Sequence, residues 1–384
     1  MAAAAGRTWG VRGKLVKLDR ARAPACALFA VAVAVAAMVP LLRSADWNPR
    51  VLAHVDPKSP LYSAAKALDP GFRGVHPLGY DGQFYWGIAV DPLALGSVHR
   101  YFDKPSYRYG HPLYGWLGWL LSAGGATAVP VALVLVGLAS LAASAVLAVG
   151  LAVARGGSGW AGLFVALNPG LVVAATNDLA EPLAAALMLA ALVALRRGRR
   201  RTVWACLALL PLAKESLLVV VAAVVVWELL RRRHTSALYF ATSSIPALLW
   251  WIYARIRLGA WFTSGSSALG LPFVGWGESL LSGRPGTQVS TLHHALVVVA
   301  LVGLLVLLSA GVAQALRLRG PEEMAYLALA AVAACLALNA TAAFTTALRN
   351  VSFLVVLLPF ALAAREPAEV PSLTAGAKLH RPVE

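Results

Sequence analysis

Acidic side chains are scarce in this chain, and this makes each one a candidate for chemistry. Asp and Glu account for 17 of its 384 residues. Asp81 lies in the stretch Gly79-Tyr80-Asp81-Gly82-Gln83, which runs directly into Phe-Tyr-Trp. A carboxylate in a cleft can act as a general base that removes a proton from a hydroxyl group. We therefore expect Asp81 to have a function.

Few other polar groups in the chain could do chemistry. They are Asp103 in Asp-Lys-Pro, Asn177-Asp178 with Glu181, Lys214-Glu215, and Arg349-Asn350. Each also has a simpler structural explanation. Asp103 precedes Lys-Pro, which is ordinary turn chemistry. Asn177 or Asp178 could cap the helix that follows, with Glu181 in its acidic first turn.

Lys214 and Glu215 are adjacent and could neutralise each other at an interface. Arg349 could extend to lipid headgroups, or it could hold an anionic phosphate. Ionisable residues within membrane spans are costly, and they usually mark pathways or sites. Both functional and structural roles therefore stay open for these residues.

The composition indicates the kind of fold that must position these groups. The chain is 59% hydrophobic and 13% charged, with a mean hydropathy of +0.71. A soluble domain carries about 25% charged residues, and apolar runs of nearly bilayer-spanning length recur here from residue 24 to residue 364. The sequence predicts an all-α, polytopic transmembrane helical bundle.

The basic residues predict the orientation of this bundle. The net charge is +16, but it is concentrated in short blocks between the apolar runs, at 7–22, 196–201, 231–233 and 317–319. This distribution follows the positive-inside rule and favours contact with anionic membrane lipids, and not with nucleic acid. We expect a protein of the cell membrane with both termini in the cytoplasm.

The expected elements follow from these blocks. We expect about ten membrane crossings. The predicted spans are 24–42, 126–153, 158–176 (broken at Asn168-Pro169-Gly170), 178–195, 202–213, 216–230, 236–256, 292–316, 321–340 and 346–364. The arms 202–213 and 216–230 form a hairpin with Lys214-Glu215 at its tip, because basic blocks flank both of its ends.

The segments outside the membrane follow from the same topology. A cytoplasmic basic N-terminus, 1–23, precedes the transmembrane domain 24–364, and a disordered cytoplasmic tail, 365–384, follows it. The long first external loop, 43–110, leads into an interfacial helix at 111–122, which is rich in Trp and Tyr. A second external loop covers 257–290. Loops as long as the first are usually functional or disordered, and its aromatic content argues against disorder.

The three cysteines, Cys26, Cys206 and Cys335, lie in apolar runs and predict neither a disulfide framework nor a metal site. The carboxylates could hold a divalent cation, because they are hard oxygen ligands. Nothing in their spacing requires a metal, and no cofactor is expected.

The combined pattern resembles the glycosyltransferase C superfamily, and most closely a bacterial, mannosyltransferase-like subgroup associated with cell-surface glycopolymers. The resemblance covers roughly residues 24–364. The residues that carry it are Gly79 to Tyr85, Asp103 to Tyr109, Asn168-Pro169, Glu181-Pro182, Lys214-Glu215-Ser216 and Arg349. The chain departs from the subgroup at Gly110-His111, where the family pattern has a Gln-Arg pair.

The resemblance implies an enzyme that moves a sugar from a polyprenyl-phosphate donor to an envelope glycan or glycolipid. Such transfer needs a base for the acceptor hydroxyl and positive charge near the departing phosphate. By motif position, the catalytic residues would be Asp81, as the base, and Asp103, a second acidic residue that binds the acceptor or helps to orient the site. The substrate-binding residues would be Tyr80, Gln83, Arg108, His111, Asn177, Asp178, Glu181, Lys214, Glu215 and Arg349. Arg108, Lys214 and Arg349 would face the phosphate.

Two other functions compete with this one. A transporter or flippase of a lipid-linked sugar or another anionic solute would also need membrane helices with polar groups. Transporters commonly have internal repeats and midplane sites, whereas this chain has no convincing repeat and its polar groups are expected at one face. A scaffold for envelope assembly would not need Asp81 and Lys214 in one cleft.

Overall fold

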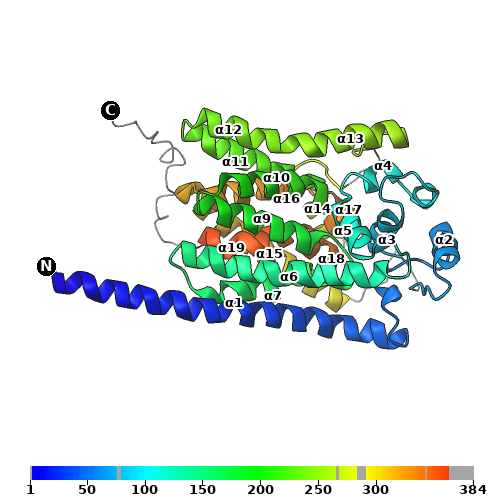
Figure 1. Cartoon of the computed structure of the whole chain (residues 1–384), viewed down its shortest axis with the longest axis horizontal. Helices are drawn as coiled ribbons and strands as arrows, with labels where there is room; N and C mark the ends of the chain where they lie inside the picture. The colour runs from blue at the N-terminus through cyan, green and yellow to red at the C-terminus, as the bar shows by residue number, and fades with distance from the viewer. Residues whose placement is uncertain (1, 76–78, 265–267, 283–290, 342–343, 363–384) are drawn as a thin grey trace, which may run out of the picture.

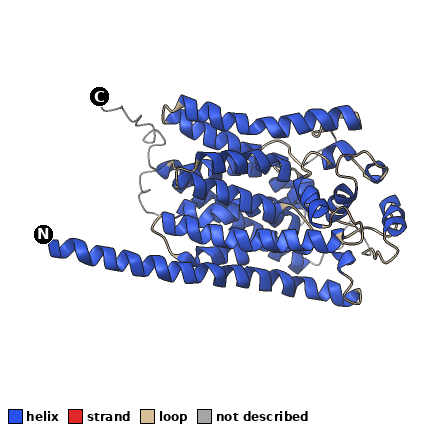
Figure 2. Cartoon of the chain, viewed as in Figure 1, coloured by secondary structure: helices blue, strands red, loops and turns tan. Residues whose placement is uncertain are grey.

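The computed structural model describes residues 2–75, 79–264, 268–282, 291–341 and 344–362. Within these ranges the regular elements are helices, and the one β-bridge pairs Leu269 with Leu336 (Figure 2). The all-α fold expected from the sequence is confirmed. The tail at 365–384, expected to be disordered, lies outside the described residues.

The longer helices overlap the expected spans, although the first begins at Ala2 and not at 24, and the spans expected at 321–340 and 346–364 are each divided between two helices. They are α1 (Ala2–Ser44), α6 (Val129–Ala154), α9 (Glu181–Arg196), α10 (Arg200–Ala213), α11 (Leu218–Leu230), α13 (Ile245–Leu258), α15 (Thr291–Leu318), α16 (Pro321–Ala334) and α19 (Ser352–Leu362). The shorter helices are α2 (Pro60–Leu68), α3 (Gly82–Val90), α4 (Pro105–Arg108), α5 (Leu113–Leu121), α7 (Leu163–Ala166), α8 (Pro169–Thr176), α12 (His234–Ala241), α14 (Val274–Ser282), α17 (Leu338–Thr341) and α18 (Phe344–Asn350). The 3₁₀ turns are η1 (Pro49–Ala53), η2 (Val98–Tyr101), η3 (Gly159–Gly162), η4 (Glu215–Leu217) and η5 (Thr242–Ser244).

The helices form a bundle with two different ends (Figure 1). The long helices run roughly side by side, and α9 packs between α6 and α10. The short helices α2 to α4 gather at one end, and α1 begins at the other (Figure 1). The segment 43–110 is therefore a folded cap of short helices, which agrees with the aromatic content of this loop.

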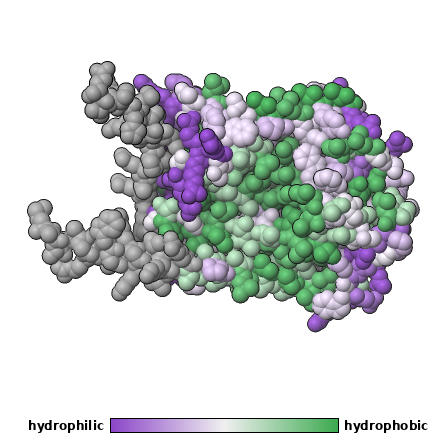
Figure 3. Space-filling model, in the orientation of Figure 1, coloured by the Kyte–Doolittle hydropathy of each residue, from purple (hydrophilic) through white to green (hydrophobic). Residues whose placement is uncertain are grey.

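Among the described residues, four helices are long and apolar enough to cross a membrane: Ala21–Ser44, Val129–Ala154, His234–Leu258 and Val298–Leu318. A fifth candidate is the pair Gly159–Ala166 and Pro169–Thr176, which is bent by 53°. Hydrophobic side chains cover the middle of the visible face, between hydrophilic patches near its two ends (Figure 3). These features are those of a membrane protein.

The remaining expected spans correspond to shorter helices, and the local sequence explains where these helices begin or are interrupted. Asn168 caps α8, because its side chain accepts from the backbone N–H groups of Gly170 and Leu171. Pro169 then occupies the first helical position, where its missing N–H is tolerated. Lys214 adopts an extended backbone between α10 and α11, which makes these two helices the arms of the expected hairpin.

A buried ionic cluster joins four helices at the end of the bundle where α1 begins. Arg155 contacts Glu322 at 3.0 Å and Glu323 at 2.7 Å, and Arg196 contacts Glu322 at 2.6 Å. Arg155 also donates to the carbonyl of Phe360. These contacts link the C-terminal ends of α6, α9 and α19 to the start of α16.

Candidate active site

Asp81 is held between two arginines from distant parts of the chain. Its Oδ1 accepts a hydrogen bond from Arg108 Nη1 at 2.9 Å, and its Oδ2 accepts one from Arg349 Nη1 at 2.9 Å. Arg108 ends α4 and Arg349 lies in the last turn of α18. Both oxygens of the expected catalytic carboxylate are therefore committed to guanidinium groups.

Each of these arginines also has a second carboxylate. Asp103 receives two hydrogen bonds from Arg108, through Nε and Nη2, both at 3.0 Å. Glu181 lies 3.4 Å from Arg349 Nε, which has no hydrogen-bond partner among the described residues. Arg349 Nη1 additionally donates to the Tyr80 hydroxyl at 3.1 Å. Both guanidinium groups are thus fixed in place independently of Asp81.

The charged network continues along the hairpin. Lys214 donates to Glu181 at 2.7 Å, and Glu215 lies 2.7 Å from Nδ1 of His111. The two neighbours at the hairpin tip therefore have separate partners, one at the start of α9 and one in the turn before α5, and they do not neutralise each other as a mutual pair. Four carboxylates in the network face three permanent cations and one histidine.

The surroundings keep Asp81 ionised. Burial raises the pKa of its carboxyl, but the Arg349 and Arg108 guanidiniums outweigh burial and bring the pKa down to about 2 from the ordinary 3.8. Burial also opposes ionisation of Asp103, and hydrogen bonds from Arg108 more than compensate and lower its pKa. In the ligand-free protein Asp81 is therefore a charged but weakly basic group.

Close backbone packing fixes the position of Asp81. It immediately precedes α3, and the next residue is Gly82. A Cβ at Gly82 would lie 2.2 Å from the carbonyl oxygen of Asn177, so only glycine lets α3 approach the junction of α8 and α9 this closely. This junction also carries Glu181 into the network.

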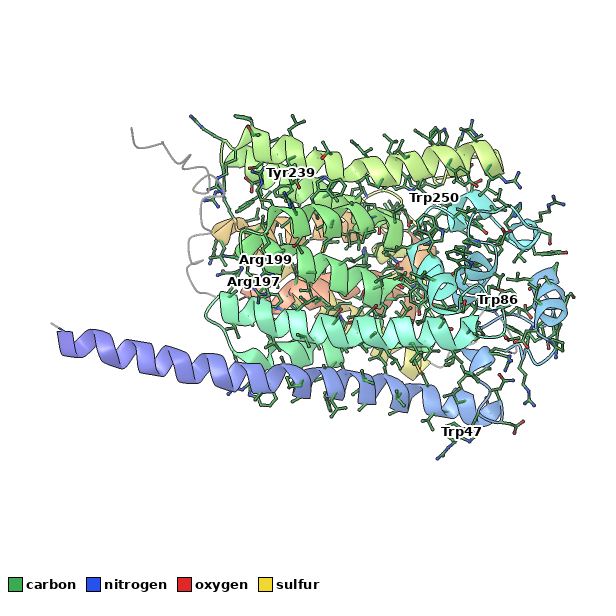
Figure 4. All side chains as sticks on the ribbon, viewed as in Figure 1. Trp47, Trp86, Arg197, Arg199, Tyr239 and Trp250 are labelled. Carbon is green, nitrogen blue, oxygen red and sulfur yellow. The ribbon has the colours of Figure 1, made fainter. Side chains whose placement is uncertain are left out.

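Two adjacent tryptophans of α13 fix the backbone beside His111. Trp250 Nε1 donates to the carbonyl of Tyr109 at 2.6 Å, and Trp251 Nε1 donates to the carbonyl of Gly110 at 2.8 Å. Trp250 lies at the same end of the bundle as Trp86 of α3 (Figure 4). A distant helix therefore sets the position of His111 toward Glu215.

The departure at Gly110 has a steric reason. A Cβ there would lie 2.9 Å from Cβ of Phe262 and 2.9 Å from the carbonyl oxygen of Tyr107. A glutamine at this position would require the Phe262 segment to move. The glycine is matched to this chain's own second loop.

Two cavities meet at the network. A small one, about 40 Å³, is lined by Asp81, Arg108, His111, Glu181, Lys214, Glu215 and Arg349, together with Phe84, Tyr85, Ile88, Tyr107 and Leu179. A larger one, about 510 Å³, shares Asp81, Tyr107, Arg108, Lys214, Glu215 and Arg349, and adds Tyr80. Its volume lies in the range of about 300–1,000 Å³ that is usual for ligand sites.

The larger cavity is polar on one side and apolar on the other. The apolar wall comes from Phe262, Ala268, Leu269, Val332, Leu336 and Ala340. These residues belong to the second loop, to α17 and to the chain around the end of α16. The cavity therefore fits a ligand with an anionic head and an apolar tail.

The expected site residues fall into two groups. The structure brings Tyr80, Asp81, Arg108, His111, Glu181, Lys214, Glu215 and Arg349 to the cavity walls, and places Asp103 behind Arg108. It places Gln83, Asn177 and Asp178 outside the linings of both cavities.

Asn177 and Asp178 do not cap the following helix either. Ala180 is at the N-cap of α9 and makes no side-chain cap. Asn177 ends α8 and donates to the carbonyl of Val173. Asp178 is fully buried, has a positive φ of 49°, and has no hydrogen-bond partner among the described residues.

Some lining residues were not expected to form the site. The Arg108 guanidinium lies 3.7 Å from the ring centroid of Phe84, a cation–π contact that supports its orientation. Tyr107 and Tyr85 each place a ring edge-on to His111, with centroids 5.7 Å apart. The sequence did mark these residues, because Phe84 and Tyr85 belong to the aromatic run after Asp81, and Tyr107 belongs to the motif from Asp103 to Tyr109. The apolar wall had no comparable signal, because its residues look like ordinary membrane-helix sequence.

The described residues contain no group of three or more His, Cys, Asp or Glu placed to hold a metal ion.

Comparison with models of known protein families finds no match for the chain, and comparisons with curated proteins and with solved structures also find none. The chemistry of the site therefore carries the functional argument.

Proposed function

We propose that this protein is a membrane glycosyltransferase of the glycosyltransferase C type. It would move a sugar from a polyprenyl-phosphate donor to a glycan or glycolipid acceptor of the cell envelope. The observation that carries the proposal is the larger cavity, in which two carboxylates and four cationic side chains, Lys104 among them, face an apolar wall. A lipid-linked sugar phosphate has an anionic head and an apolar chain, so it matches both sides.

The proposed topology places this site on the extracytoplasmic face. Arg197 and Arg199 lie toward the end of the bundle opposite Trp47 and Trp86 (Figure 4). Basic blocks mark the cytoplasmic side of membrane proteins. We propose about ten crossings, in which the short helices α9, α10, α11, α16 and α19 complete the bundle.

In the proposed reaction Asp81 acts as the general base. It takes the proton as the O–H bond of the acceptor breaks, and the acceptor oxygen forms a bond to the anomeric carbon of the sugar. The bond from that carbon to the phosphate oxygen breaks at the same time, and the electron pair leaves with the lipid phosphate. The proton then passes from Asp81 to solvent.

The cations have a matching role. The lipid phosphate gains one negative charge as it departs, and fixed positive groups are the usual means of stabilising such charge. Arg108, Arg349 and Lys214 stand at the wall of the same cavity as Asp81. Asp103 and Glu181 hold these cations in place, and they are positioning residues in this scheme.

The proposal can be tested with purified protein in proteoliposomes. Polyprenyl-phosphate donors that differ in their labelled sugar are supplied with an envelope glycan fraction, and both free lipid phosphate and labelled acceptor are measured. We expect one donor to release lipid phosphate in an acceptor-dependent way. Arg349→Gln should lower the rate by at least about a hundredfold, and Arg73→Gln, which removes a half-exposed arginine paired with Asp46, should not.

The transporter alternative predicts a different result in the same vesicles. A flippase would carry the intact labelled donor from one leaflet to the other and release no lipid phosphate. Movement of intact donor without transfer would therefore replace the proposed function with this alternative.

A further inference from the structure

The site is occupied by its own carboxylate before any ligand arrives. Asp81 uses both oxygens on Arg108 and Arg349 at 2.9 Å each, in the lining of the cavity that the donor phosphate would enter. The network already balances its cations with carboxylates. A phosphate therefore meets no uncompensated positive charge unless one carboxylate gives way.

Asp81 is the carboxylate that is positioned to leave Arg108 and Arg349. Its side chain is 35% exposed and lines the larger cavity, whereas Asp103 lines neither cavity and Glu181 is only 4% exposed. Arg108 keeps two hydrogen bonds to Asp103 when Asp81 leaves. Arg349 keeps Glu181 at 3.4 Å and the Tyr80 hydroxyl. The two guanidiniums can therefore exchange one anion for another without moving.

We propose that the donor phosphate takes the place of Asp81 on Arg108 and Arg349, so that donor binding itself frees the catalytic carboxylate. This inference rests on the proposed function and adds a coupling to it. A phosphodiester carries one negative charge and two non-bridging oxygens, as a carboxylate does. The exchange replaces each charge-assisted hydrogen bond with one of the same kind.

The exchange gives the site its order of events. With both oxygens on guanidiniums, Asp81 offers a poor acceptor for a proton, because opposite charge favours its ionised form. Once released, it has a free lone pair beside the bound phosphate. During transfer Asp81 loses its negative charge by protonation while the phosphate gains one, and the summed charge of the site stays constant. An acceptor that arrives without donor meets an inactive base.

The test measures binding without turnover. The probe is a short-chain polyprenyl phosphate that carries no sugar, titrated into the full-length protein in detergent micelles. If Asp81 competes for the arginines, Asp81→Asn removes the competitor and should bind the probe about tenfold more tightly than the wild type. Asp46→Asn, an equal charge change on an 82% exposed side chain of the same segment, should bind like the wild type.

The outcomes separate this inference from the proposed function. Equal or weaker binding by Asp81→Asn, with Arg349→Gln abolishing binding, overturns the exchange and leaves the phosphate site standing. Absence of binding in the wild type and in every variant overturns both. Thermal unfolding of each variant in the same detergent shows whether it is folded.

A second measurement uses the wild type alone and so does not depend on a variant that folds. Infrared difference spectra of protein with ¹³C-labelled aspartate carboxyls should show a carboxylate band that shifts on addition of the probe. An unchanged carboxylate spectrum at saturating probe would overturn the exchange.

Discussion

Asp81 owes its properties to its partners and not to its own sequence position. The stretch from Gly79 to Gln83 marks it as unusual, but its pKa depends on Arg108 and Arg349, which are remote in sequence. A carboxylate without these arginines at the same place would be a stronger base, and it would be active whether or not donor is bound. The arginine pair makes Asp81 stable as an anion until another anion replaces it.

This pairing predicts how stability depends on pH. The pKa of Asp81 is about 2 in the folded chain, against the ordinary 3.8. Because the folded pKa is the lower one, ionised Asp81 contributes its full stability above about pH 4 and loses it as the pH falls through about 2. The melting temperature of the wild type should exceed that of Asp81→Asn near neutral pH, and the gap should narrow on acidification. A gap that widens as the pH falls would contradict the assignment.

At the scale of the elements, glycines set the distances between the parts of the site. Gly82 lets α3 meet the junction of α8 and α9, and Gly110 makes room for Phe262. The sequence shows these glycines, but the contacts that require them span 95 and 152 positions along the chain. Such contacts depend on how the helices pack, so local sequence patterns do not reveal them.

Gly82→Ala should therefore displace Asp81 without removing any polar group. The new methyl would meet the Asn177 carbonyl at 2.2 Å, so α3 must shift. Displacement of about 1 Å at a catalytic group can cost about a hundredfold in rate, and we expect a loss of at least about tenfold in acceptor-dependent lipid phosphate release. Gly277→Ala is the control, because a Cβ there meets nothing within 4 Å. Full activity in Gly82→Ala would show that this close approach does not position the base.

The ionic cluster at the other end of the bundle is structural. Glu322 is 1% exposed and contacts both Arg155 and Arg196. Glu322→Gln leaves two buried arginines short of a counter-charge, and breaking a buried pair in this way costs about 3–5 kcal/mol. Thermal unfolding should show a clear fall in melting temperature, whereas Glu278→Gln, at an exposed position of α14, should change it little. Equal melting temperatures for Glu322→Gln and the wild type would show that this cluster does not stabilise the bundle.

The sequence predicted much of the bundle and part of the site. Continuous apolar runs and basic blocks located the long helices, and the break at Asn168-Pro169 appears as the bend before α8. The ion-pair partners within the site could not be predicted. The adjacent residues Lys214 and Glu215 pair with Glu181 and His111, because Lys214 has an extended backbone and Glu215 begins the 3₁₀ turn η4, so their side chains reach different partners.

At the scale of the whole molecule, the two ends have different roles in the proposed function. One end carries the folded cap of short helices, and the other carries the start of α1 and the turn with Arg197 and Arg199 (Figure 1, Figure 4). The charged cavity is lined by Asp81 and Arg108 of the cap. This separation fits an enzyme that takes a lipid-borne donor from the membrane and acts at one surface. A midplane transport site would need its charged groups deeper between the ends.

The sidedness follows from this arrangement and can be measured in intact cells. In a chain whose Cys26, Cys206 and Cys335 are replaced by serine, a cysteine at Asp46 should react with a membrane-impermeant maleimide. A cysteine at Arg201 should react only after permeabilisation, because basic blocks stay in the cytoplasm. Both residues are exposed, so access to reagent decides the result. The reverse labelling would place the site on the cytoplasmic face and exclude the proposed donor orientation.

The central claim is that Asp81 is the base of a sugar transfer from a lipid phosphate. The most direct test is acceptor-dependent release of lipid phosphate by Asp81→Asn in proteoliposomes, beside the wild type and Asp46→Asn. Loss of a general base lowers the rate about 10²–10⁴-fold. We expect Asp81→Asn to fall by this factor with an unfolding profile that shows a folded protein, and Asp46→Asn to keep wild-type turnover. Wild-type turnover by Asp81→Asn would contradict the account.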